Sequence, residues 1–425
     1  TLEDIPELCN RYGIHSIIIA IPTLKGSKLN HVIDLCVSTH CVVQLLSDPQ
    51  LVGSGAPQQG AFRELNPADF LSRDEVTLDT DQISGYLTGK TVLVTGGGGS
   101  IGSELCRQVM RFKPGKLLIF DIYENCAYEL LMELQQKYGR DIPVTVLVGS
   151  IRDKKRLDEV FETYHPTVVF HAAAHKHVPL MEVSPAEAVK NNVLGTKNLL
   201  VSASEHDVER FVQLSTDKAV NPTSVMGCTK RICEMLIQTF AGNTDMKCVA
   251  VRFGNVLGSH GSVIPLFEAQ IKKGGPVTLT DPNIERYFMT IPEAAQLVLQ
   301  AGALAESGNI YVLDMGEPVK IMDLAKQLIR FYGYEPGVNM EIKIVGLRPG
   351  EKLYEELMMD EEQDKMRRTQ HNKIFVASPR SIDLAEFYEQ LQELAKAAQH
   401  NDEGVVQQLA KMIPTFTPTR QNLKL

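Results

Sequence analysis

The sequence predicts an α/β protein with a doubly wound parallel sheet and a smaller C-terminal lobe. From residue 90 onward, short apolar segments alternate with amphipathic segments of helical length, which is typical of a parallel sheet covered by helices on both faces. The first of these apolar segments runs into a glycine-rich turn that opens a helix. After residue 255 the alternation gives way to loops and short strands, which indicates a separate lobe.

Composition agrees with a soluble globular protein of two or three domains. The chain has 425 residues, of which 44% are hydrophobic and 22% charged. Its net charge of −9 disfavours binding to nucleic acid or anionic lipid. The eight cysteines form no CxxC pair, which predicts reduced thiols rather than disulfides or a zinc site. No apolar run reaches the roughly 18 residues of a membrane helix.

Residues 1–48 are predicted to be a fragment of an α/β unit. The expected elements are a helix at 4–12, a strand at 17–21, a helix at 28–38 and a strand at 41–46. One strand–helix–strand unit is too small for a domain of its own, so it either docks on the rest of the chain or lacks a partner segment. Residues 49–84 are rich in Gly, Pro, Ser and Asp and are expected to be a linker.

The central domain is assigned to residues 85–255. Its expected strands are 91–95, 117–121, 144–148, 168–171, 211–216 and 248–253, and its expected helices are 100–112, 125–138, 185–204 and 223–241. Residues 256–380, with one clear helix at 292–305, are assigned to a lobe interleaved with this domain. Residues 381–425 are expected to be helical at 383–399 and 404–412.

A glycine-rich loop follows the first central strand. Gly96, Gly99 and Gly102 have GxxGxxG spacing, which allows a tight turn and lets backbone N–H groups approach a pyrophosphate at the positive end of a helix. Asp121 ends the next strand 19 residues after Gly102 and is suited to hold a hydroxyl of the adenosine ribose, which favours NAD over NADP. The loop therefore predicts an NAD-binding, Rossmann-type sheet.

Other strand ends are expected to face the same cofactor, because ligands lie beyond the carboxyl ends of parallel strands. The predicted cofactor contacts are Gly96, Gly99, Ser100, Ile101, Gly102, Asp121, Ser150, Ile151, Arg152, Ala172, Ala173, Ala174, Asn192 and Lys230. His171, His175 and His177 lie close together in sequence, but no acid or cysteine accompanies them. We therefore expect no metal site.

The fifth strand is expected to end in Thr216, Asp217 and Lys218, and a helix carrying Met226 and Lys230 follows. The arrangement is similar to that of short-chain dehydrogenase/reductase enzymes, in which a Ser or Thr precedes a YxxxK motif and the Tyr and Lys share one helix face. Lys230 occupies the lysine position, but Met226 replaces the tyrosine and cannot transfer a proton. A plain alcohol dehydrogenase is therefore disfavoured.

Asp217 and Lys218 remain as an adjacent acid and base. Successive side chains of an extended strand point to opposite sides, so the two are expected to address different atoms of one substrate. Neutral Lys218 would remove a carbon-bound proton and protonated Asp217 would donate to a leaving hydroxyl. A direct ion pair would oppose both protonation states, and a purely structural salt bridge is the alternative.

The second half of the chain supplies candidate groups for a diphosphate. Asn255, Arg286 and Arg348 would suit phosphate oxygens, and Glu351 would accept a ribose hydroxyl. Taken separately, each is better explained as a solvated surface group, and it is their shared placement after the nucleotide-binding half that favours a site.

Seven segments together carry a family resemblance: TGGGGSIGSELCRQ, HAAAHKHVPLMEVSP, NNVLGT, STDKAVNPTSVMGCTKR, RFGNVLGS, RYFMTIPEA and RPGEKLYEEL. Across residues 85–380 the chain resembles extended short-chain dehydrogenase/reductases that act as nucleotide-sugar 4,6-dehydratases in polysaccharide biosynthesis. It is most similar to large, membrane-anchored UDP-N-acetylglucosamine 4,6-dehydratases, which also carry Met in place of Tyr. The resemblance implies that residues 1–48 are the tail of an upstream Rossmann-like domain. It also implies a soluble truncation of a protein attached to the cytoplasmic face of a bacterial inner membrane.

The resemblance also implies a reaction. Hydride would leave C4 of UDP-N-acetylglucosamine for bound NAD and return to C6, giving a 4-keto-6-deoxy sugar with retained C5 configuration. Lys218 would take the C5 proton, Asp217 would protonate the departing C6 hydroxyl, and Thr216 would bind the C4 hydroxyl. Lys176 and His177 would lie near the sugar. A homo-oligomer paired through the helices at 185–204 and 223–241 is expected.

Two alternatives stay open. A nucleotide-sugar 4-epimerase would use the same scaffold, but it needs no acid to expel the C6 hydroxyl. A non-catalytic NAD-binding module would explain the missing tyrosine, but it needs neither Asp217 nor Lys218.

Overall fold

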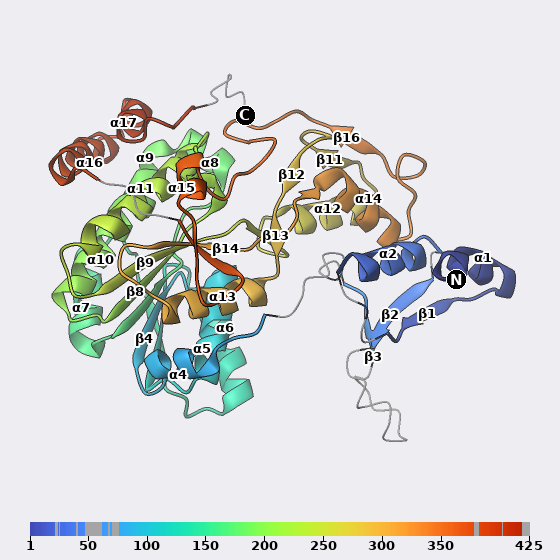
Figure 1. Cartoon of the computed structure of the whole chain (residues 1–425), viewed down its shortest axis with the longest axis horizontal. Coiled ribbons are helices and arrows are strands. Elements are labelled where there is room, and N and C mark those ends of the chain that lie inside the picture. The colour runs from blue at the N-terminus through green and yellow to red at the C-terminus, as the bar shows by residue number, and fades with distance from the viewer. Residues whose placement is uncertain are drawn as a thin grey trace. The chain divides into compact units, whose positions relative to one another are not determined.

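The computed structural model describes residues 1–21, 24, 26–39, 41–46, 62–66, 69, 76–377, 382–401 and 403–418. The chain divides into two compact units, each assembled from several segments, whose elements are labelled in Figure 1. Unit 1 contains Thr1–Glu75, Asn255–Thr290 and Glu317–Leu347, and unit 2 contains Val76–Gly254, Ile291–Gly316 and Arg348–Leu425. Within the described ranges, every helix is too short or too polar to span a bilayer.

Unit 2 is built on one large sheet. Its strands are β4 (Thr91–Thr95), β5 (Lys116–Asp121), β6 (Val144–Val148), β7 (Val168–His171), β8 (Arg210–Leu214), β9 (Lys247–Arg252), β14 (Ile310–Leu313), β17 (Arg367–Arg368) and β18 (Ile374–Ala377). The sheet has nine strands in the order β17-β18-β14-β9-β8-β7-β4-β5-β6. The strands from β14 to β6 pair in parallel, whereas β18 is antiparallel to both β14 and β17.

The six strands from β6 to β9 have the strand order of a doubly wound, dinucleotide-binding sheet. The order reverses between β4 and β7, and such a switch point is where a ligand crevice forms in this architecture. Val92, Leu93 and Val94 in β4 are completely buried, as expected for a parallel strand that is covered on both faces. The predicted fold class is therefore confirmed.

Helices cover both faces of this sheet. They are α4 (Thr80–Leu87), α5 (Ser100–Arg111), α6 (Glu124–Tyr138), α7 (Lys154–Tyr164), α8 (Val178–Val183), α9 (Pro185–Ala188), α10 (Gly195–Glu205), α11 (Val225–Ala241), α13 (Ile291–Ala303), α15 (Asp360–Asp364), α16 (Leu384–Gln399) and α17 (Val405–Met412). Helices α5, α6 and α13 contact the sheet on one face, and α7, α10 and α11 bury their apolar residues in the core of the other. A π-helical turn, η3 (Val189–Leu194), joins α9 to α10, so the predicted helix at 185–204 is continuous but locally widened.

The boundaries of unit 2 differ from the sequence-based expectation. Helix α4 begins at Thr80, inside the predicted linker, because Asp79 caps it by accepting a hydrogen bond from the Gln82 N–H at 3.0 Å. Residues 291–316 and 348–377 fall in unit 2 rather than in the predicted lobe at 256–380. The reason is that β14 and β18 extend the central sheet beyond β9, which a sequence pattern of short strands does not reveal.

The C-terminal helices cover part of the helical layer. Helix α16 contacts α9 and η3, and α17 contacts α9 and α11. Phe387, Leu391 and Leu394 of α16 are buried in the same core cluster as the sheet. These contacts occupy surface on the helices that were expected to pair two copies of the chain. Self-association itself stays a prediction.

Unit 1 contains the predicted strand–helix–strand segment. Its elements are α1 (Ile5–Tyr12), β1 (Ser16–Ile19), α2 (Gly26–Val37), β2 (Val42–Leu46), β3 (Phe62–Glu64), β10 (Asn255–Val256), α12 (Val263–Lys272), β11 (Val277–Leu279), β12 (Glu285–Arg286), β13 (Phe288–Met289), β15 (Val319–Lys320), α14 (Ile321–Phe331) and β16 (Ile342–Ile344). Strands β1 and β2 are parallel. Buried residues of α2 pack in one hydrophobic core with buried residues of α12 and α14. Gln327 Nε2 also donates to Asp34 Oδ1 at 2.9 Å. The N-terminal segment therefore docks on later parts of the chain. Most of the predicted linker lies outside the described residues.

Candidate active site

The glycine loop between β4 and α5 has no room for larger residues. Gly96 has a φ of +67°, and a Cβ placed there would lie 2.6 Å from the Ala173 nitrogen after β7. A Cβ on Gly102 would overlap the Gly96 carbonyl oxygen. Gly99 precedes α5 without a side-chain cap, and the N-terminus of a helix is a favourable place for an anion. The loop thus forms a backbone cradle of the kind that binds a pyrophosphate.

Asp121 at the end of β5 shapes this cradle. Its Oδ2 accepts a hydrogen bond from the Gly98 N–H at 2.8 Å, and its Oδ1 accepts one from the Tyr123 N–H at 2.9 Å. Both bonds fix the carboxylate beside the loop, where each oxygen keeps a lone pair for a further donor. A ribose hydroxyl at this position stays a prediction that the geometry permits.

The ends of β6 and β7 border the same edge of the sheet. Ser150 Oγ accepts from the Arg152 N–H at 3.2 Å, and Arg152 forms an exposed ion pair with Glu187 at 2.7 Å. Ile151 is buried against Gly195. The three alanines at 172–174 are half-buried, with Ala173 pressed close to Gly96. These positions fit a dinucleotide lying close to the sheet edge.

Asn192 is buried, and both atoms of its amide group are hydrogen-bonded. It lies in η3, where its Oδ1 accepts from the His175 N–H at 2.8 Å. Its Nδ2 donates to the His175 carbonyl at 3.0 Å and to Thr229 Oγ1 at 3.0 Å. The amide therefore holds the segment after β7 against α11, and a contact of Asn192 with the cofactor stays a prediction.

His171 is a structural residue. Its Nδ1 lies 2.7 Å from Thr95 Oγ1 and its Nε2 lies 2.9 Å from Thr196 Oγ1. Burial, with a further contribution from the Lys230 charge, lowers the pKa of His171 to about 3. Both ring nitrogens are thus occupied, and the ring is neutral at any physiological pH.

Met226 and Lys230 lie on one face of α11, as predicted. Ser224 caps the helix by accepting from the Gly227 N–H at 3.1 Å. Lys230 Nζ donates to the Leu214 carbonyl at 2.6 Å, which aims its ammonium at the carboxyl end of β8. Burial lowers the pKa of Lys230, and Met226 is buried on the same side.

The residues after β8 form a tight turn instead of an extended strand. Strand β8 ends at Leu214, and Asp217–Ala219 form a short 3₁₀ turn, η4. Thr216 Oγ1 caps this turn by accepting from the Lys218 N–H and donates to Asp217 Oδ1 at 2.7 Å. The expectation that Asp217 and Lys218 point to opposite sides is therefore wrong, because the alternation of a strand ends where the turn begins.

Asp217 and Lys218 instead form a direct ion pair. Lys218 Nζ lies 3.0 Å from Asp217 Oδ1. The Asp217 side chain is completely buried, whereas Lys218 is 23% exposed and Thr216 is half-buried. Asp217 Oδ2 accepts no hydrogen bond from any described residue. The buried Asp217 carboxylate is therefore linked to two partly exposed groups, the Thr216 hydroxyl and the Lys218 ammonium.

A second carboxylate, Glu355, reaches the same lysine and was not predicted as a site residue. Glu355 Oε1 lies 3.5 Å from Lys218 Nζ, and its side chain is 2% exposed. It belongs to the loop at 348–359, which precedes α15. The sequence signal was its position inside the segment RPGEKLYEEL, but nothing in that segment relates Glu355 to β8.

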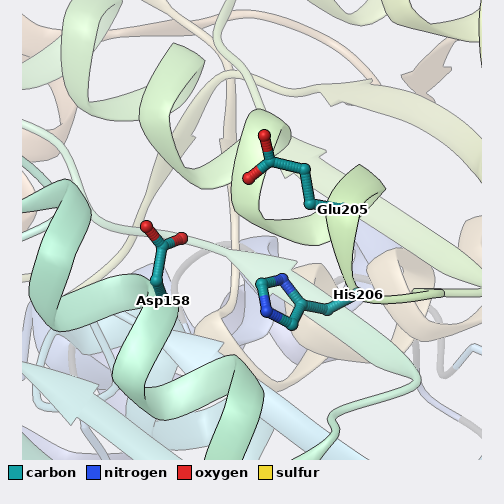
Figure 2. A group of neighbouring side chains, drawn as sticks. All are labelled: Asp158, Glu205 and His206. Carbon is teal, nitrogen blue, oxygen red and sulfur yellow. The ribbon is translucent and has the colours of Figure 1, made fainter.

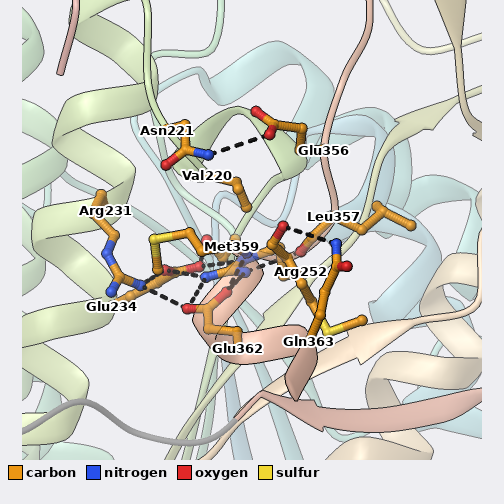
Figure 3. A network of polar contacts seen from close by, with 12 residues as sticks. Val220, Asn221, Arg231, Glu234, Arg252, Glu356, Leu357, Met359, Glu362 and Gln363 are labelled. Carbon is orange, nitrogen blue, oxygen red and sulfur yellow. Dashed lines mark hydrogen bonds and ion pairs between the residues drawn. The ribbon is translucent and has the colours of Figure 1, made fainter. Parts of the chain in front are cut away.

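A buried ionic network is centred on Arg252 (Figure 3). Arg252, at the end of β9, is completely buried between Glu234 of α11 and Glu362 of α15, with ion-pair distances of 2.8 Å to each. Arg231 pairs with Glu234 at 2.8 Å, and Ser215 Oγ donates to Glu234 Oε1 at 2.7 Å. Although burial opposes ionisation, the nearby guanidinium groups, chiefly Arg252, lower the pKa of Glu234 to about 2. The network joins β8, β9, α11 and α15 into one support for the turn.

The predicted substrate contacts fall in both units. In unit 2, Lys176 and His177 are exposed just before α8, and exposed Arg348 donates its N–H to Glu351 Oε2 at 3.0 Å. In unit 1, Asn255 is half-buried at the start of β10, and Arg286 is buried in β12, where its Nη1 donates to the Glu285 carbonyl at 2.7 Å. Their convergence on one diphosphate stays a prediction.

One group of potential metal ligands lies away from this edge, among Asp158, Glu205 and His206 (Figure 2). Lys154 Nζ already binds Asp158 Oδ1 at 2.6 Å and Glu205 Oε2 at 2.9 Å. His206 Nδ1 is engaged with the Ser202 carbonyl at 2.8 Å. The Lys154 ammonium therefore already bridges the two carboxylates, and the group is a surface ion-pair cluster.

Several relatives share most of this chain. It is 53% identical over 360 residues to the capsular polysaccharide biosynthesis protein CapD of Staphylococcus aureus, a match covering 84% of this chain and 60% of that protein. A UDP-N-acetylglucosamine 4,6-dehydratase (inverting) of Campylobacter jejuni is 33% identical over 271 residues, covering 63% of this chain and 76% of the relative. A UDP-glucose 4-epimerase of Rickettsia canadensis is 36% identical over 287 residues, covering 65% and 80%. The chain spans about 60% of the length of CapD.

Solved structures agree with the fold. Pen from Bacillus thuringiensis is 34% identical with a TM-score of 0.64, covering 69% of this chain and 89% of that one. The dTDP-glucose 4,6-dehydratase DesIV of Streptomyces venezuelae, solved with NAD bound, shares the fold at 20% identity and a TM-score of 0.57, covering 74% and 97%. The family model described as polysaccharide biosynthesis protein matches residues 92–379. With a Rossmann-type sheet and a match over more than half of its length, the chain belongs to the polysaccharide biosynthesis protein family.

Proposed function

We propose that this chain is a nucleotide-sugar-modifying enzyme of polysaccharide biosynthesis and, more specifically, an NAD-dependent UDP-N-acetylglucosamine 4,6-dehydratase. The observation that carries the proposal is the group formed by Thr216, Asp217 and Lys218 at the carboxyl end of β8. This group lies at the same edge of the sheet as the glycine loop that follows β4. It offers a hydroxyl, a carboxylate and an amine in direct contact, as acid–base elimination requires. The CapD relative supports a role in polysaccharide biosynthesis, and the C. jejuni dehydratase supports the more specific assignment.

NAD fits the residues of unit 2. Gly96, Gly99 and Gly102 would cradle its pyrophosphate, Asp121 would hold the adenosine ribose, and Lys230 would hold the nicotinamide ribose. When bound, NAD would supply hydride transfer, from C4 of the sugar and back to C6. The side chains of the site would then only accept and donate protons.

Thr216 and Asp217 together would replace the missing tyrosine. The C4 hydroxyl would give its proton to the Thr216 hydroxyl while Thr216 passes its own proton to Asp217 Oδ1, which already accepts that hydrogen bond at 2.7 Å. Oxygens on C4 and C6 are close neighbours in a hexose, so the same hydroxyl can return the proton to the departing C6 oxygen. Water then leaves, and Asp217 ends as it began.

Lys218 would act on C5, the carbon between C4 and C6 of the sugar. Its side chain is 23% exposed, whereas that of Asp217 is completely buried, so Lys218 is the better placed of the two to contact C5. A neutral amine would take the C5 proton once C4 is a ketone, and would give a proton back to C5 after hydride reaches C6. The net change is loss of one water, with each side chain restored.

A 4-epimerase is the second candidate, because the R. canadensis relative carries that name. An epimerase transfers hydride to and from C4 alone and leaves C5 and C6 untouched. The acid–base pair of Asp217 and Lys218 favours elimination over this outcome. Membrane attachment through a segment outside this chain stays a prediction.

Product analysis in deuterated water tests the proposal. Purified protein is incubated with NAD and UDP-N-acetylglucosamine in D₂O, and the product is examined by NMR. We expect a 4-keto-6-deoxy sugar with deuterium at C5, because the Lys218 ammonium has already exchanged its hydrogens for deuterium before the sugar binds and returns one of them to C5. The C5 configuration, predicted to be retained, is read from the same spectrum. A 4-epimer with hydrogen at C5, or unchanged substrate, would contradict the proposal.

A further inference from the structure

We propose that Glu355 is a positioning residue that acts through Lys218, by taking the ammonium proton and leaving a neutral amine to face the substrate. The inference rests on the proposed function, in which a neutral Lys218 removes the C5 proton. Lys218 Nζ lies between two carboxylates, 3.0 Å from Asp217 and 3.5 Å from Glu355. One of these, Asp217, already has a task with Thr216.

The loop that carries Glu355 is anchored on both sides of it. Thr223 Oγ1 donates to the Gly350 carbonyl at 3.0 Å, and Lys352 Nζ donates to the Val220 carbonyl at 3.0 Å. Beyond Glu355, Arg252 Nη1 donates to the Leu357 carbonyl at 3.0 Å. The loop is therefore held against the segment that follows Lys218, which keeps Glu355 beside the ammonium.

Desolvation would drive the proton transfer. The Asp217 and Glu355 side chains are 0% and 2% exposed, so Lys218, at 23%, is the part of the group that water reaches. A sugar covering Lys218 would remove that water. An ammonium and a carboxylate then become a costly pair, and the neutral amine and carboxylic acid become favourable.

The proton balance closes over one turnover. The Lys218 Nζ–H bond breaks and a Glu355 O–H bond forms, after which the amine takes the C5 proton. When hydride has reached C6, the ammonium returns a proton to C5. Glu355 then gives its proton back to Lys218, so no outside acid or base is consumed.

Other charged groups around the turn have partners of their own. In the loop, Lys352 pairs with Glu356 at 2.9 Å. From α8, Glu182 Oε1 accepts from the Val225 N–H at 2.7 Å, and from α11, Lys230 Nζ donates to the Leu214 carbonyl at 2.6 Å. The exchange of the Lys218 proton is therefore assigned to Glu355, with Asp217 hydrogen-bonded to Thr216 and these groups as fixed surroundings.

The test is the pH dependence of kcat in the Glu355→Gln variant, with Glu356→Gln as the matched control. Glu356 is the next residue in the same loop, is exposed, and pairs with Lys352 and Asn221. In wild-type protein the proton stays inside the site, so kcat should be flat around neutral pH. In Glu355→Gln, Lys218 must lose its proton to solvent. We therefore expect kcat to be about 10²-fold lower at pH 7 and to rise about tenfold per pH unit toward alkaline pH, with KM unchanged.

A second readout separates this role from loop damage. Removal of the C5 proton becomes slow in Glu355→Gln, so C5-deuterated substrate should show a larger isotope effect on kcat than with wild type. A pH-independent loss, the same profile in Glu356→Gln, or a faster Glu355→Gln enzyme at pH 7 would each overturn the inference. Formation of the 4-keto-6-deoxy product by the wild-type protein is measured separately. If the wild-type protein makes no such product, the proposed function fails; if it does and Glu355→Gln behaves like Glu356→Gln, only the role of Glu355 fails.

Discussion

Replacing Lys218 with methionine is expected to lower kcat for dehydration by about 10²–10⁴-fold, the range that a positioned acid–base group contributes. Methionine keeps most of the side-chain length but has no nitrogen to take the C5 proton. The product assay described above measures the loss. Dinucleotide binding should be unchanged, because Lys218 lies in η4 and takes no part in the glycine cradle of β4 and α5.

Lys411→Met is the matched control for this change. Lys411 lies in α17, where it forms an exposed ion pair with Glu393 at 2.8 Å, so the same chemical change there should leave turnover as in the wild type. A Lys218→Met protein that folds, binds NAD and still dehydrates the sugar at the wild-type rate would remove Lys218 from the mechanism.

Replacing Arg252 with methionine is expected to lower the free energy of unfolding by about 3–5 kcal/mol. Arg252 is completely buried, and its loss leaves the buried carboxylates of Glu234 and Glu362 with Arg231 as their remaining guanidinium partner. Denaturant unfolding at neutral pH measures the effect. Arg367→Met is the control, since Arg367 is 59% exposed and only 4.0 Å from Glu306. Equal stabilities of the two variants would show that the network contributes nothing.

The same network predicts how stability depends on pH. The folded protein holds the pKa of Glu234 at about 2, below its ordinary value of 4.5, so the unfolded chain binds this proton more readily. The stabilisation is therefore complete above about pH 4.5 and is lost as the pH falls toward 2. In Arg252→Met this loss should be smaller, because the largest cause of the low pKa of Glu234 is gone.

Much of the Rossmann-type unit is predictable from sequence, because its signals are local. Apolar runs such as Val92–Val94 mark strands that are buried on both faces, and Gly96 to Gly102 mark a turn that only glycine permits. The positions of Met226 and Lys230 also follow, since residues four apart share a helix face.

The sequence did not predict the residue at which β8 ends, nor the contacts between segments that are far apart in sequence. The alternation rule placed Asp217 and Lys218 on opposite sides, but the Thr216 hydroxyl caps a turn there and brings them together. Glu355 lies 137 residues after Lys218 in sequence and reaches it through tertiary packing. Arg252 similarly follows an apolar strand in the sequence, and no local pattern relates it to its carboxylate partners Glu234 and Glu362.

The fate of a deuterium atom at C4 of the substrate tests the central claim most directly. UDP-N-acetylglucosamine deuterated at C4 is converted in ordinary water, and the position of the label in the product is read by NMR and mass spectrometry. If Thr216, Asp217 and Lys218 expel water while hydride passes from C4 to C6, the product is a 4-keto-6-deoxy sugar with the deuterium in its C6 methyl group. Deuterium that stays at C4, or that is lost to water, would contradict the account.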